Sequence, residues 1–146
     1  MIKLGAAAAA AGVLLSGAHA AYENGLFLDP GMPGAENDIR QEIKDHKGEF
    51  GNLIRIGGEK VDEDAAIELK TDTAIGLKGA GIDGVEKIDV LLEQSTEDLA
   101  RVQVVVYLKD KRTFMAEGIS TIARDGVTAA RKYAIWNGLG QIKEKI

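Results

Sequence analysis

Alternating apolar and polar residues mark three strands in the second half of the chain. In each segment, aliphatic residues recur at every second position, which is the period of a strand with one buried face. The three segments are residues 86–93, 102–108 and 113–122. The charged run Lys109-Asp110-Lys111-Arg112 separates the last two, so we predict that they pair as an antiparallel hairpin.

The pattern between residues 50 and 80 is more ambiguous. Residues 67–78 also alternate, and this predicts a half-buried strand or a hairpin bent near Thr71-Asp72-Thr73. A short strand is predicted at Leu53–Ile56, which lies between glycines. The acidic run Asp62-Glu63-Asp64 predicts either the start of a helix or a solvated turn.

Apolar residues at helical spacing occur before and after these predicted strands. This spacing predicts a short helix over residues 39–46 and a longer one that begins at Asp125 or Thr128 and runs to about Lys143. Together the elements predict an α+β fold. We expect an antiparallel sheet of about four to six strands, with the short N-terminal helix and the long C-terminal helix packed on one face.

The first twenty residues have the features of a secretory signal peptide. A charged start at Lys3 precedes a mild apolar run, and Ala18-x-Ala20 matches the small-residue site that signal peptidases cleave. The alternative is an uncleaved N-terminal anchor, although the run is short for a membrane span. We therefore divide the chain into a signal peptide (1–20), an irregular lead-in (21–34) and a single domain (35–146).

Composition narrows the classes of function. The 146 residues carry 18 Lys and Arg against 23 Asp and Glu, and the net charge of −5 disfavours nucleic-acid binding. Cysteine is absent, which excludes disulfides, thiolate nucleophiles and Cys-ligated metals. One histidine, His46, lies outside the predicted signal peptide. A transition-metal site would then need several converging carboxylates, so we predict no metal site and no cofactor.

Three motifs bear on chemistry, and each has a structural interpretation that we favour. Residues 79–84 match G-x-G-x-x-G, but an alternating segment follows where a dinucleotide site requires a helix, so we predict a glycine-rich connection between strands. His46 suits a helix C-terminus, and neither Ser95 nor Ser120 has a nucleophile motif. Residues 62–64 lack the glycine and glutamate of a calcium loop. No catalytic residue is predicted.

The C-terminal helix has apolar residues in two stripes at helical spacing. The first stripe, expected to pack on the sheet, consists of Val127, Ala134, Gly138 and Ile142. The second stripe consists of Ala129, Tyr133, Trp136 and Gly140. We predict that residues 21–60 cover the second stripe or that it forms a surface for a protein partner, since aromatic anchors over small residues favour such contacts. In both cases Trp136 is expected to be shielded from water.

The end of the chain resembles a known envelope module. The segment Ala116–Ile122, then Gly126, Ala130-Arg131, Ala134-Ile135, Leu139 and Gln141 carry the resemblance. It is to the N-terminal domain of the flagellar assembly protein T family and related small exported lipoproteins. There a glycine-bearing strand precedes a helix rich in small residues. The chain departs from the family at Gly138, where alanine is expected, and it has no lipid-attachment cysteine. The resemblance covers about the last third of the chain and implies an assembly factor without catalytic residues.

A second resemblance reaches further upstream. Asp98–Val102, Arg112-Thr113-Phe114 and Gly118–Thr121 are similar to the C-terminal regulatory domain of 2-isopropylmalate synthases. In that domain a strand pair leads into a small-residue helix and the site binds an amino-acid effector. Ile122 stands where the family has an aspartate after Ser-Thr. This resemblance implies a small-ligand site.

We therefore expect a non-enzymatic envelope protein, periplasmic or secreted, that acts as an interaction or assembly module. Its partner is expected to be another protein or a second copy, without stable membrane insertion once the signal peptide is removed. The alternative is a domain that binds a small amino-acid-like ligand. A third interpretation is a hydrolase whose carboxylate site the sequence does not reveal.

Overall fold

The computed structural model describes residues 6–10, 14–16, 32–122 and 126–146. The chain divides into two units, residues 1–30 and 31–146. In the first unit, β1 (Ala6–Ala10) pairs antiparallel with β2 (Leu14–Ser16). The predicted cleavage site and the lead-in as far as residue 31 lie outside the described residues. None of the described helices has the length and apolar character that crossing a bilayer requires.

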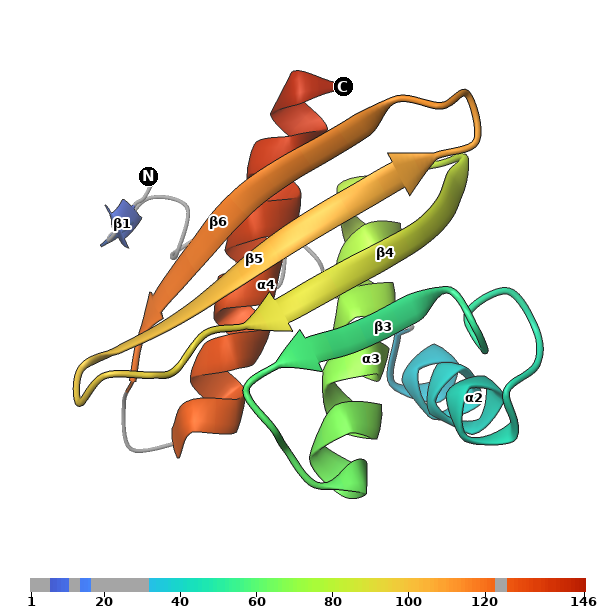
Figure 1. Cartoon of the computed structure of the whole chain (residues 1–146), viewed down its shortest axis with the longest axis horizontal. Coiled ribbons are helices and arrows are strands. Elements are labelled where there is room, and N and C mark those ends of the chain that lie inside the picture. The colour runs from blue at the N-terminus through green and yellow to red at the C-terminus, as the bar shows by residue number, and fades with distance from the viewer. Residues whose placement is uncertain (1–5, 11–13, 17–31, 123–125) are drawn as a thin grey trace. The chain divides into compact units, whose positions relative to one another are not determined.

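The second unit has an α+β fold, as predicted. Its elements are α2 (Met32–Asp45), β3 (Ile54–Gly58), α3 (Glu63–Ala80), β4 (Val85–Leu92), β5 (Leu99–Leu108), β6 (Thr113–Thr121) and α4 (Gly126–Lys145). The strands form one sheet in the order β3-β4-β5-β6. Helices α3 and α4 lie across one face of this sheet, and α2 packs against α3 (Figure 1).

The prediction of a wholly antiparallel sheet is wrong, because β3 runs parallel to β4. The cause is the connection between them. Two neighbouring strands that run in the same direction need a crossover, and here that crossover is the helix α3. β4, β5 and β6 are consecutive antiparallel neighbours, so the sheet is mixed.

The alternating segment at residues 67–78 is part of α3 and not a strand or hairpin. Asp62 caps the helix, since its carboxylate accepts a hydrogen bond from the N–H of Ala65 at 2.7 Å. Gly81, in the left-handed conformation at φ 69°, ends it. All residues from Thr71 to Leu77 are buried, because α2, α4 and the sheet surround this part of α3. A helix buried on most sides shows no single apolar stripe, and chance alternation then looks like a strand.

The β5–β6 hairpin and the C-terminal helix agree with the predictions. Asp110 accepts hydrogen bonds from the backbone N–H and from Nε of Arg112, and these close the turn between the strands. Along β5 the inward residues are buried and alternate with half-buried outward ones. The inward side chains of β4 and β5, together with those of α3 and α4, form the core.

Gly118 of β6 sets how closely α4 packs on the sheet. A Cβ atom at this position would overlap the carbonyl of Ala134, and one at Gly138 would lie 3.0 Å from Val104. At Gly118 the backbone of the sheet therefore lies directly against the backbone of α4, and at Gly138 the helix lies close to the side chain of Val104. This contact fixes α4 on β5 and β6.

The free edge of β6 is closed by side chains of α4. Asn137 accepts a hydrogen bond from the N–H of Ile119 at 3.3 Å, and Gln141 donates to the carbonyl of Glu117 at 3.0 Å. Lys145, one further turn along, donates to the carbonyl of Met115 at 2.8 Å. These backbone groups are the ones that an added strand would use, so the three side chains oppose edge-to-edge pairing.

Candidate functional site

The structure places Trp136 inside the molecule. Its side chain is 2% exposed, and its Nε1 donates a hydrogen bond of 2.8 Å to the carbonyl of Asp72 in α3. Gly76 of α3 lies beside the ring, since a Cβ there would be 2.7 Å from it. The expected shielding of Trp136 is confirmed, and among the described residues α3 contributes to it. Residues 21–31, part of the segment expected to cover the second stripe, lie outside the described residues. Trp136 itself is therefore not available as an anchor for a partner, whereas Tyr133 of the same stripe is half-buried.

Asp72 is a buried carboxylate at the junction of the three helices. It is 7% exposed, and burial raises its pKa to about 7, although the positive charge of Lys132 on α4 opposes this change. One turn earlier on α3, Glu68 binds Arg40 of α2 at 3.0 Å, and Arg40 also binds Glu36. Charged groups on all three helices, namely Lys132 on α4, Glu68 on α3 and Arg40 on α2, therefore act on the carboxyl group of Asp72.

The motifs considered for catalysis do not come together. Gly81 and Gly84 adopt positive φ in the connection from α3 to β4, so residues 79–84 join a helix to a strand rather than two strands. His46 is exposed at the end of α2, where it adopts φ 55°. Asp62 caps α3, and Glu63 and Asp64 occupy its first turn, so these residues start a helix. Among the described residues, no group of His, Asp and Glu side chains is placed to hold a metal ion.

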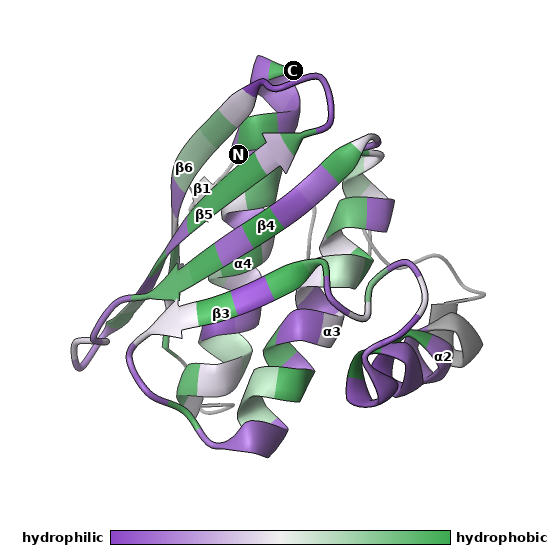
Figure 2. Ribbon diagram, turned by 45° about the vertical axis from the view of Figure 1, so that its right-hand side comes forward, coloured by the Kyte–Doolittle hydropathy of each residue, from purple (hydrophilic) through white to green (hydrophobic). Residues whose placement is uncertain are grey.

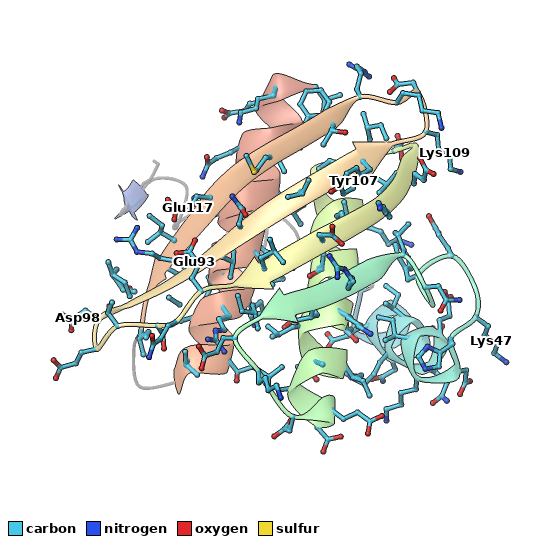
Figure 3. The ribbon with its side chains drawn as sticks, in the orientation of Figure 1. Lys47, Glu93, Asp98, Tyr107, Lys109 and Glu117 are labelled. Carbon is cyan, nitrogen blue, oxygen red and sulfur yellow. The ribbon has the colours of Figure 1, made fainter. Side chains whose placement is uncertain are left out.

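The face of the sheet opposite α3 and α4 is not covered by any described helix (Figure 2). We call it the open face. Its outward residues are Arg55, Gly57, Lys87, Asp89, Leu91, Leu99, Arg101, Gln103, Val105, Tyr107, Thr113, Met115, Glu117, Ile119 and Thr121. Met115 is 53% exposed and Ile119 is 40% exposed. Figure 3 shows Tyr107 and Glu117 on this side, away from the helices.

Four of the five charged residues of the open face form ion pairs, Arg55 with Asp89 and Arg101 with Glu117. Arg55 donates from Nε to Asp89 at 3.0 Å, and this hydrogen bond is the main reason that the pKa of Asp89 lies below its usual range. Tyr107 donates to the same carboxylate at 3.4 Å, and its ring lies 4.5 Å from Nζ of Lys87. Each such pair adds little stability at a surface. Together, however, these contacts produce a surface on which ion pairs lie between apolar side chains.

A cavity of about 380 Å³ lies at the C-terminal end of α3. The buried side chains of Phe50, Leu77 and Ile82 form its apolar floor. Its charged lining residues are Glu49, Asp83, Glu86, Lys78 and Lys109. None of these five makes a salt bridge with another described residue. The volume is within the range of small-molecule sites.

The open face was not identified as a candidate surface from the sequence, although β6 contains a signal for it. Its inward residues Ala116, Gly118 and Ser120 are small, which is expected beneath a closely packed helix. Its outward residues Met115 and Ile119 are large and apolar, so from residue 115 to the end of the strand the larger apolar side chains point away from the core. Small inward residues opposite large apolar outward residues are therefore the signal for an apolar outer face.

Comparison with known proteins does not assign the chain to a family: no protein-family model matches it, and no match was found among curated proteins.

Proposed function

We propose that the protein is a non-enzymatic module of the cell envelope, exported and periplasmic or secreted, that binds another protein through the open face. The observation that carries this proposal is the exposure of Met115 and Ile119 on a sheet face that lies opposite both packed helices. Large apolar side chains grouped among polar ones on a surface are typical of protein contacts.

The charges of the open face favour the same interpretation. Arg55 lies 3.0 Å from Asp89, and Arg101 lies 3.8 Å from Glu117. A partner that covers either carboxylate therefore removes water from an ion pair and not from a single charge. The apolar side chains between these ion pairs supply the apolar surface that a partner would bury. The leader-like residues 1–20 and the resemblance of residues 116–141 to exported assembly proteins support the envelope role.

Site-specific photocrosslinking in the native host tests this proposal. A photoreactive amino acid replaces Met115 on the open face, and the control carries it in place of Ile146, which is 44% exposed at the end of α4. We expect a crosslinked protein, identified by mass spectrometry, from position 115 and none from position 146. Equal labelling from both positions, or none from position 115, would contradict the proposal.

The cavity at the end of α3 supports a second candidate, the binding of a small amino-acid-like molecule. An apolar floor with unpaired charges of both signs at its rim is complementary to a molecule that carries an amino group, a carboxylate and an apolar side chain. Thermal unfolding with single amino acids tests it. A ligand at a hundred times its Kd stabilises the folded state by about 2.7 kcal/mol. The same shift in a Lys78→Ala, Lys109→Ala variant would place the binding elsewhere, and no shift with any amino acid would refute this candidate.

A further inference from the structure

We infer that the partner at the open face is a second copy of this chain, so that two sheets stack face to face across a two-fold axis. The inference rests on the proposed function, because it names the occupant of the same surface. Three features carry it: the charge of the open face, its area and the closure of the sheet edge at β6.

The open face differs in charge from the rest of the chain. It carries Arg55, Lys87 and Arg101 against Asp89 and Glu117, a sum of +1. Because the whole chain has a net charge of −5, the remaining residues sum to −6. Two copies that approach through other surfaces bring like charges together, whereas two open faces meet with little net charge. Electrostatics therefore favours this face for contact between identical molecules.

The area of the face is suitable for a weak dimer. The four strands have 5, 8, 10 and 9 residues. At about 3.3 Å per residue and about 4.8 Å between strands, they cover roughly 510 Å² on each copy. Stable protein interfaces bury about 800 Å² per partner, so a face of this size is smaller than theirs and suits a weak contact. Met115 and Ile119 would supply much of the apolar burial, since they are the most exposed large apolar side chains of the sheet. We expect dissociation in the micromolar range.

The sheet edges leave the face as the better surface for self-association. At β6 the side chains of Asn137, Gln141 and Lys145 already occupy backbone groups that an added strand would need. The opposite edge strand, β3, is five residues long and ends in Gly57-Gly58. Short edge strands are poor templates for strand addition. Stacking through the face uses neither edge.

Light scattering coupled to size-exclusion chromatography tests the inference on the purified protein over a wide range of micromolar concentrations. The test variants are Met115→Lys and Ile119→Lys, which place new positive charges on both copies of the face. The matched control is Ile146→Lys, because Ile146 is also a large exposed apolar residue but lies off the sheet. We expect a concentration-dependent dimer for the wild type and for the control. The two test variants should be monomers whose circular dichroism and unfolding midpoint match the wild type.

Each other outcome is decisive. A dimer that persists in both test variants would place the interface elsewhere and overturn the inference. A wild type that stays monomeric also overturns it, and the crosslinking at position 115 then separates two cases. A crosslink to a different protein retains the proposed function with another partner, whereas no crosslink removes both.

Discussion

Replacing Asp72 with asparagine should stabilise the protein at neutral and alkaline pH. The carboxyl group has an ordinary pKa of 3.8, and burial raises it to about 7 in the folded state. The folded protein therefore holds the proton more tightly than the unfolded chain does. As the pH rises from about 4 to 7, the unfolded chain has released this proton while the folded protein retains it, so the free energy of unfolding falls. Above pH 7 this loss levels off.

The size of the effect follows from the two pKa values. At 1.36 kcal/mol for each pH unit between them, the ionisation of Asp72 costs about 4 kcal/mol of stability at pH 8 and less than about 1 kcal/mol at pH 4. Asparagine has nearly the same shape and no charge, so Asp72→Asn should recover most of this difference at pH 8. Urea unfolding at both pH values, followed by the fluorescence of Trp136, measures it.

The control is Asp98→Asn, which changes an exposed carboxylate in the loop between β4 and β5. It should alter stability by a few tenths of a kcal/mol at most. Equal effects of Asp72→Asn at pH 4 and pH 8 would show that the amide acts through packing and not through charge. A destabilised variant at pH 8 would refute the reasoning altogether.

Three further predictions concern packing, the sheet edge and the N-terminus. Gly118→Ala should lower the free energy of unfolding in urea by about 1–3 kcal/mol or more, because its Cβ would overlap the backbone of α4. The control Gly57→Ala, also in a strand, should cost clearly less. Equal costs would contradict the close approach of α4 to β6. Gln141→Ala frees the carbonyl of Glu117, so the variant should aggregate faster than the wild type in light scattering at equal concentration. Unchanged aggregation kinetics would mean that the hydrogen bond from Gln141 does not protect the β6 edge. Intact mass of the protein from its native host should correspond to a chain that starts at Ala21, and a mass that includes residues 1–20 would favour the anchor instead.

The strands β4, β5 and β6 could be predicted because each has one buried and one open side. Val102, Val104 and Val106 are completely buried, while their neighbours Gln103 and Val105 face outward, so the alternation of the sequence reproduces the geometry. The same reasoning failed for α3, where consecutive residues are buried by different neighbours. Thr71 and Thr73 contributed to the error, since β-branched residues favour strands. In the structure their hydroxyl groups donate to the carbonyls of Ile67 and Leu69 within the helix.

End signals would have corrected the prediction for α3. Asp62 stands at the capping position, Glu63 and Asp64 follow in the first turn, and Gly81 ends the helix. These local signals do not depend on which sides of the helix are buried. The parallel pairing of β3 follows directly once α3 is recognised as a crossover. The location of the open face depends on which side of the sheet the helices cover, and that is set by tertiary packing rather than by any one segment.

The crossover also bears on the order in which the fold assembles and opens. Short connections join β4, β5 and β6, so their pairing closes small loops, whereas β3 reaches β4 only across the 18 residues of α3 and its flanking turns. The meander and α4 thus form a largely local unit, to which β3 and α2 are added by longer-range contacts. Such late additions are also the first parts to detach in partial unfolding. The β3 side is therefore where amide hydrogens should exchange soonest, while the meander beneath α4 retains its protection longest.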